Sequence, residues 1–171
     1  MIVFAAAGLF GWEEYSRREE ARPKVQQTFW DIAVGMKGEE VIFRKGQPAE
    51  KEDDVWTYYE PKSKIYYFVG FRGGAVRWIR AQAHEDDVAN LPTIQGISAF
   101  SSSEDVEAKF GRPEVVDESE DHERRLFNYT RFGVFFGLER NHVRTVGVFD
   151  PKMDPIRFEK AGNKDEKKPV K

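Results

Sequence analysis

The sequence predicts an α+β fold of two tandem repeats, each a short helical segment packed on an antiparallel three- to four-stranded sheet. Residues 39–48 match residues 104–113 at four of ten positions, and residues 68–79 match residues 135–146 at four of twelve. Each first block ends in Gly-x-Pro, which is typical of a helix end, and each second block contains two β-rich runs joined by a short turn. Duplication of one helix-and-sheet unit explains why the blocks recur in the same order.

The chain begins with an uncharged apolar run, MIVFAAAGLFGW, followed at once by charged residues. About 20 apolar residues are needed to span a bilayer, and a signal peptide normally opens with a basic region, which is missing. We interpret residues 1–12 as the remnant of a membrane anchor or as an export segment. The alternative is a buried terminal helix of a soluble protein.

The first block of each repeat is predicted to be a short helix with both ends marked. Ser101 or Ser102 can cap the second helix, and Gly38 holds the corresponding place before the first. Gly46 and Gly111 suit the positive-φ position that ends a helix, and a proline two residues later prevents continuation. We therefore expect the chain to turn sharply after each helix.

The second block of each repeat is predicted to consist of strands. These strands are expected at residues 55–60, 64–72, 75–81, 124–130, 133–139 and 142–149. Gly73-Gly74 is a strong hairpin signal, and Arg140-Asn141 is a weaker one because only Asn tolerates positive φ well. One face of each sheet should hold the helix.

With 171 residues, the chain has room for one ordinary domain or two small ones. We expect an apolar segment and a charged helix at residues 1–29, then repeats at 30–90 and 91–152. Residues 153–171 are rich in lysine and lack a periodic apolar face, so they cannot bury enough surface to offset the entropy of ordering. We expect them to form a disordered charged tail.

Composition excludes several classes of chemistry. The chain has no cysteine, which removes disulfides, thiolate nucleophiles and cysteine-ligated metals. Its net charge is -3 with both signs interspersed, so no nucleic-acid partner is expected. His84, His122 and His142 lie in separate segments without metal-ligand spacing, and the acidic stretches 85–87 and 118–121 lack the pattern of a calcium loop. We predict no catalytic residue, no metal and no cofactor, and hence no enzyme.

A helix closing on Gly-x-Pro, an aromatic strand and a Phe-x-x-Gly-x-Val-x-x-Ile hairpin together resemble the SmpA/OmlA (BamE) family of small bacterial envelope proteins. These motifs are Gly46-Gln47-Pro48, Trp56-Thr57-Tyr58 and residues 71–79 in the first copy, and Gly111-Arg112-Pro113, Phe127-Asn128-Tyr129 and residues 138–146 in the second. The tandem arrangement is similar to the β-lactamase-inhibitory protein. The resemblance implies an α+β protein that grips other proteins at or outside the cytoplasmic membrane, without the lipoprotein cysteine of the assembly family.

The predicted strands carry more aromatic bulk than one small helix per repeat can cover. Aromatic residues with arginines nearby are what interface hot spots are made of. Our candidate partner-binding residues are Trp56, Tyr58, Tyr66, Phe68, Trp78, Arg80 and Phe135. The alternative for any one of them is a place in the core, because the alternation does not say which face holds the helix.

These observations favour a non-enzymatic protein-binding or scaffolding module of the bacterial cell envelope, on the periplasmic side and either membrane-associated or exported. Its partner is expected to be another protein or a membrane protein complex of which it is an accessory subunit. One alternative is a soluble exported binder that acts like an inhibitor. Another is a small-molecule or lipid-binding domain, which would need a deep pocket between the repeats.

Overall fold

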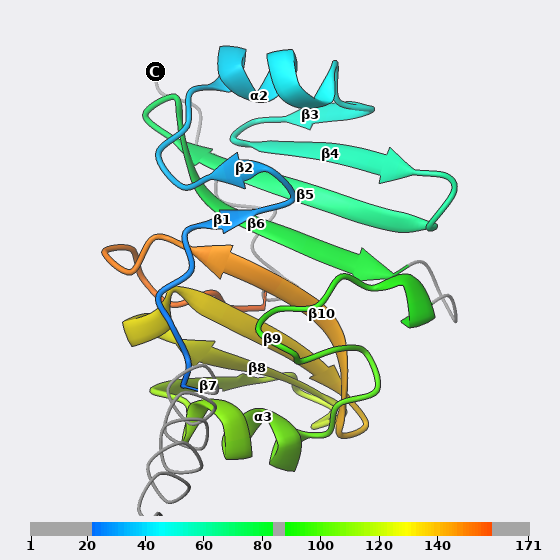
Figure 1. The fold of residues 1–171 in the computed structure, drawn as a ribbon, viewed down its shortest axis with the longest axis vertical. Helices are drawn as coiled ribbons and strands as arrows, with labels where there is room; N and C mark the ends of the chain where they lie inside the picture. Colours follow the sequence, from blue (N-terminus) through cyan, green and yellow to red (C-terminus); the bar gives the residue numbers. More distant parts are fainter. Residues whose placement is uncertain (1–21, 84–87, 159–171) are drawn as a thin grey trace, which may run out of the picture.

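The computed structural model describes residues 22–83 and 88–158, and their main element is one antiparallel sheet (Figure 1). Its eight strands run in the order β3-β4-β5-β6-β10-β9-β8-β7. Their bounds are β3 (Glu50–Glu52), β4 (Val55–Glu60), β5 (Ile65–Arg72), β6 (Ala75–Ala83), β7 (Val115–Glu118), β8 (Arg124–Tyr129), β9 (Val134–Glu139) and β10 (His142–Phe149). A two-stranded ribbon precedes it, formed by β1 (Thr28–Phe29) and β2 (Ile32–Ala33).

The prediction of an α+β fold made of two tandem helix-on-sheet repeats is wrong. Strand β6 pairs with β10 in register from Gln82↔Thr145 to Trp78↔Phe149, so the strands form one continuous eight-stranded sheet. The α-helices within the described ranges are α2 (Gly38–Lys45) and α3 (Ser103–Phe110), each of eight residues. The fold is therefore predominantly β, because hydrogen bonding across β6 and β10 removes the sheet edges that two separate units would present.

The helices nonetheless occupy the predicted segments, and their ends are built largely as expected. Ser102 caps α3 by accepting a hydrogen bond from the Asp105 backbone N–H. The cap of α2 is Lys37 rather than Gly38. The glycines that end the helices, Gly46 and Gly111, have φ of 78° and 79°, values that favour glycine over residues with a β-carbon.

Two buried tyrosines tie the helix ends to the sheet. The hydroxyl of Tyr58 on β4 donates to the Gly46 carbonyl at 3.3 Å, and that of Tyr129 on β8 donates to the Gly111 carbonyl at 3.0 Å. Burial raises the pKa of Tyr58 to about 12 and shifts the pKa of Tyr129 upward as well. Both phenols are therefore neutral donors at ordinary pH.

The two hairpin turns adopt the backbone that their residues favour. Gly73 and Gly74 have φ of 62° and 74°, and Arg140 and Asn141 have φ of 46° and 73°, so both central residues of each turn are left-handed. The six predicted strands agree with the observed ones to within two residues at each end. The sequence missed the two edge strands, β3 and β7, and the β1-β2 ribbon.

One face of the sheet is fully covered and holds the main core. Helices α2 and α3, the β1-β2 ribbon and the chain from residue 88 to 102 all pack on this side. Ile32, Val41, Ile94 and Val106 are completely buried there, and Trp30 stacks on Tyr67 with ring centroids 4.0 Å apart. We call this the helix side.

The other face of the sheet is covered over strands β8, β9 and β10 by Met153–Phe158, which we call the C-terminal strap. Met153, Ile156 and Phe158 pack on a small second core of Leu126, Phe135 and Phe149. The side chain of Asn128, fully buried, bonds the main chain of Ile156 twice, donating to its carbonyl at 3.0 Å and accepting from its N–H at 2.8 Å. Residues 153–158, expected in the disordered tail, thus follow a defined path, while 159–171 lie outside the described residues.

The candidate membrane segment at residues 1–12 also lies outside the described residues. Within residues 22–83 and 88–158, no helix is both long enough and apolar enough to cross a bilayer.

Candidate functional site

Four of the predicted partner-binding residues share one surface on the side of the sheet opposite the helices. Cross-strand pairs place Tyr59 beside Tyr66, Phe68 beside Arg80, and Gly70 beside Trp78. Because side chains in a strand alternate between faces, Tyr59, Tyr66, Phe68, Trp78 and Arg80 all point to the same side of β4, β5 and β6. We call these five residues the aromatic face.

The aromatic face is a continuous row of ring contacts. The ring centroids of Tyr59 and Tyr66 are 4.7 Å apart, and those of Tyr66 and Phe68 are 6.3 Å apart. The Arg80 guanidinium lies over the Phe68 ring at 4.2 Å and reaches the Trp78 ring at 5.7 Å. Cation–π and ring contacts of this kind hold neighbouring side chains in one arrangement.

Trp78 owes its position to a missing β-carbon. A Cβ built on Gly70 would lie 2.0 Å from Trp78 Cε2 and 2.1 Å from its Nε1, so the indole rests directly on the backbone of β5. Trp78 is the residue of the aromatic face that also packs against the second core beneath the strap.

The other predicted residues lie elsewhere. Trp56 and Tyr58 are on the helix side: Trp56 packs against Phe71 with centroids 4.4 Å apart, and Tyr58 is buried beneath the end of α2. Phe135 lies on the same side as the aromatic face but is completely buried with Phe149. Tyr59, which the sequence prediction omitted, is 39% exposed. Its alternation with Tyr58 was the available signal.

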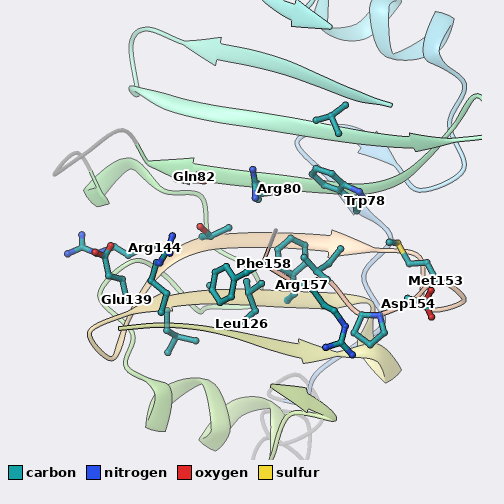
Figure 2. A pocket seen from close by; sticks show the side chains of 18 residues that line it. Trp78, Arg80, Gln82, Leu126, Glu139, Arg144, Met153, Asp154, Arg157 and Phe158 are labelled. Atoms are coloured by element: carbon teal, nitrogen blue, oxygen red, sulfur yellow. The ribbon is translucent and has the colours of Figure 1, made fainter. Parts of the chain in front are cut away.

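A cavity of about 610 Å³ lies beside the aromatic face, between the central strands and the C-terminal strap (Figure 2). Its floor is the stretch around Gly137 and Thr145, where glycine contributes no side chain. Figure 2 shows Arg144 and Glu139 at one end and Met153 and Asp154 at the other, with Phe158 and Leu126 between them. From the sequence, a deep pocket was expected only for the alternative of a small-molecule or lipid-binding domain.

Arginines dominate the charge around this cavity. Arg80, Arg124, Arg144 and Arg157 line it against two carboxylates, Glu139 and Asp154. Two of these arginines already interact with other side chains. Arg157 forms an ion pair with Asp117 at 3.4 Å, and the Arg124 guanidinium lies 5.3 Å from the centroid of the Phe158 ring. The Nε of Arg144 is buried and has no hydrogen-bond partner among the described residues.

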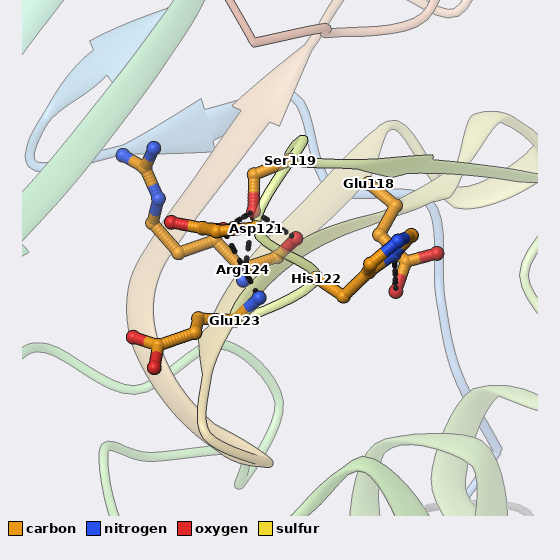
Figure 3. Close-up of polar contacts among 6 residues, drawn as sticks. All are labelled: Glu118, Ser119, Asp121, His122, Glu123 and Arg124. Carbon is orange, nitrogen blue, oxygen red and sulfur yellow. Dashed lines mark hydrogen bonds and ion pairs between the residues drawn. The ribbon is translucent and has the colours of Figure 1, made fainter.

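The acidic stretch after β7 forms a loop that satisfies its own polar groups (Figure 3). The hydroxyl of Ser119 donates to Asp121 Oδ1 and accepts from the Arg124 N–H at 3.0 Å. Asp121 also accepts from the Glu123 N–H, and the hydrogen bond from Ser119 is the main reason that its pKa lies below the ordinary value. His122 contacts Glu118 at 3.3 Å.

No group of three or more His, Asp or Glu within 22–83 and 88–158 could hold a metal ion. His84 and the acidic residues 85–87 lie outside the described residues.

Comparison with known proteins identifies fold relatives and no family. No family model matches the chain, and neither does any characterised protein sequence. A DUF4309 family protein from Bacillus subtilis is similar in structure, with a TM-score of 0.54 and 11% identity over 78% of this chain and 91% of that one. A cysteine-rich secretory protein from Staphylococcus aureus has a TM-score of 0.50 and 12% identity over 77% of this chain and 48% of its own length. At these identities the likeness concerns the fold alone.

Proposed function

We propose that this chain is a non-enzymatic protein-binding module of the bacterial cell envelope that holds a partner protein through the aromatic face. In this role it acts as a scaffold or as an accessory subunit of a membrane complex. The observation that carries the proposal is the continuous row formed by Tyr59, Tyr66, Phe68, Arg80 and Trp78. Tyr, Trp and Arg are the residues that contribute most to protein interfaces.

The setting of the row supports this role. Its side chains stand on three paired strands, so they lose little conformational freedom when a partner binds, and pre-organisation of this kind favours affinity. The Arg80 guanidinium, held over two rings, adds a positive charge to an otherwise apolar strip. A partner surface with apolar side chains around a carboxylate complements this arrangement.

Placement outside the cytoplasm is part of the proposal. One of the two structural relatives is described as a secretory protein, which supports export of this chain. We propose that residues 1–12 attach the protein to the membrane. The alternative, a soluble exported binder, predicts the same aromatic face with no membrane association. Cell fractionation separates the two: the full chain should sediment with membranes, and a variant lacking residues 1–12 should not.

Affinity purification of the full chain tests the partner-binding role. The wild-type protein, Tyr59→Ala and Phe68→Ala would be recovered from membrane and secreted fractions under identical conditions. Phe43→Ala is the matched control, because Phe43 is an aromatic residue on α2 that is 92% exposed and lies on the helix side. We expect a stoichiometric partner whose affinity, measured with purified proteins, falls at least about tenfold in the two aromatic-face variants and stays unchanged in the control.

Two results would contradict the proposal. Recovery of the protein alone from both fractions would argue against a partner. Equal loss of binding in Phe43→Ala would place the interface elsewhere on the molecule.

A further inference from the structure

The cavity under the C-terminal strap has the size of a small-molecule site. Its volume of about 610 Å³ falls within the range of about 300 to 1,000 Å³ that is usual for ligand pockets. It lies where β6 meets β10, and Gly137 and Thr145 form its floor. The strap, tied down through Asn128, forms the opposite wall. The hollow is therefore enclosed by sheet on one side and by ordered chain on the other.

One end of the cavity is built for an anion. Arg144 sits at a β-bulge, since the pairing of β10 with β9 skips from Val143 to Thr145. Bulges re-aim side chains and occur frequently beside functional sites. The buried Nε of Arg144 lacks a hydrogen-bond partner among the described residues, and a buried donor without a partner is unfavourable unless a ligand or water accepts from it. Arg80 and Arg124 line the same cavity and add positive charge.

Apolar side chains form much of the remaining wall, beside Gln82, Asp154 and Arg157. Trp78, Leu126, Ile156 and Phe158 line it and belong to the second core or pack against it. Of the two carboxylates, Glu139 stands at the arginine end and Asp154 at the far end. The arrangement combines several arginines with an apolar wall, which is a pattern that orients an amphipathic anion.

We propose that this cavity binds a small amphipathic carboxylate. The carboxylate accepts hydrogen bonds from Arg144 at the bulge, and the hydrocarbon body packs on Trp78 and Phe158. Glu139 opposes this anion by charge repulsion and keeps the affinity moderate. The site shares Trp78 and Arg80 with the aromatic face and does not depend on a protein partner.

Titrations with model ligands test the site on the full chain. The probes are 4-phenylbutyrate and octanoate at pH 7, each paired with its uncharged amide, and the readout is the amide and indole NMR shifts together with the dissociation constant. We expect both acids to bind with Kd of about 1 mM or tighter, as ligands of this size allow, and to shift the Trp78 indole and Gly137 amide signals. The amides should bind about tenfold more weakly.

Two charge variants are expected to change the affinity for the acids in opposite directions. Arg144→Gln should weaken binding of the acids about tenfold and leave the amides unchanged, whereas Glu139→Gln should tighten the acids by about twofold to fivefold. Arg140→Gln is the matched control, because it makes the same charge change in the exposed β9-β10 turn outside the cavity. Thermal unfolding of each variant shows that the fold is retained.

Three outcomes would overturn the proposal. The first is that neither acid binds below about 10 mM, and the second is that acid and amide bind equally. The third is that Arg140→Gln weakens the acids as much as Arg144→Gln does, which would indicate a response to net charge alone.

Discussion

Three strand glycines shape the side of the sheet that carries both proposed sites. Gly70 lies beneath the Trp78 indole, and Gly147 lies beneath Phe135, whose ring would be 2.3 Å from an added Cβ. Gly137 faces Thr145 across the floor of the cavity. Glycine usually weakens a strand, but here each missing side chain leaves space for a larger cross-strand neighbour or for the cavity itself.

Gly70→Ala should displace Trp78 and destabilise the protein. The three atoms nearest to the added Cβ all belong to the Trp78 side chain, and overpacking of this kind typically costs about 1 to 3 kcal/mol of the free energy of unfolding. In a Trp78→Ala background the same change should cost less than about 0.5 kcal/mol, because the clash is gone. Urea unfolding of the four proteins in this double-mutant cycle measures the coupling. Equal costs in both backgrounds would mean that Trp78 does not depend on Gly70.

At the scale of the elements, the N-termini of the two helices differ in the number of capping hydrogen bonds. Ser102 and Asp105 bond each other's backbone N–H groups at the start of α3. At the start of α2, Glu40 accepts from the Lys37 N–H at 3.1 Å, but a lysine side chain has no acceptor to return the contact. Helix α2 therefore begins with one fewer cap bond than α3.

This difference predicts opposite effects of two substitutions. Ser102→Ala should lower the free energy of unfolding by about 1 kcal/mol, and Lys37→Ser should raise it by about 0.5 to 1 kcal/mol, because the Lys37 backbone is already extended as a cap requires. Chemical denaturation with unchanged m-values measures both. Loss of stability in Lys37→Ser would show that the lysine stem contributes more than a cap hydroxyl.

Helix α3 is also joined to the β9-β10 turn through Asn141, whose amide donates to Glu104 Oε2 at 3.0 Å. The backbone N–H of Glu104 and the Asn141 amide hold the pKa of this carboxyl at about 2, below its ordinary value of 4.5. Because the folded pKa is depressed, the stabilising contribution is present above about pH 4.5 and is lost as the pH falls toward 2.

Glu104→Gln should therefore flatten the acid side of the stability profile. Between pH 5 and pH 3, the wild-type protein should lose more free energy of unfolding than Glu104→Gln does. Glu107→Gln, on the same helix, is the control and should follow the wild-type slope. If the free energy of unfolding changed equally with pH in all three proteins, the Asn141 contact would not contribute to acid-dependent stability.

At the scale of the whole molecule, the two sides of the sheet are covered unequally. The helix side holds the main core, whereas the opposite side has the second core under the strap and the aromatic face on β4, β5 and β6. The strap covers the proposed ligand cavity, whose lining includes Trp78 and Arg80 of the proposed protein-binding surface. Its attachment includes two hydrogen bonds to the buried Asn128 side chain and further contacts of Arg157 and Phe158 with Asp117.

Asn128→Ala should loosen the strap as well as destabilise the fold. Removing the amide leaves the N–H and carbonyl of Ile156 without partners, at an expected cost of about 1 to 3 kcal/mol in the free energy of unfolding. Hydrogen exchange at the Ile156 amide should speed up by more than the global loss of stability explains. Asn90→Ala, which removes an exposed contact to the Ser63 carbonyl, is the control. Unchanged protection at Ile156 would contradict this role.

Four of the candidate residues predicted from the sequence share the aromatic face, and the sequence did not separate the two faces where aromatic residues alternate. Tyr58 and Tyr59 are chemically alike, yet one is buried under α2 and the other is exposed on the opposite side. Tyr66 and Tyr67 show the same difference, since Tyr67 is buried on the helix side. Alternation defines two faces, but with apolar side chains on both it does not say which face the helices cover. The setting of Arg144 could not be predicted from the sequence, because its bulge arises from strand pairing.

Helix caps, glycine stops and hairpin turns could be predicted from the amino-acid sequence because each depends on a few consecutive residues and their backbone preferences. The pairing of β6 with β10 could not, since it joins residues far apart in the chain and no local signal marks it. That pairing merges the strands into a single sheet, and the return of Met153–Phe158 across it encloses the cavity. Backbone preferences and cap hydrogen bonds act between residues that are close in sequence. The order of the strands and the choice of the covered face depend instead on burial summed over the whole molecule.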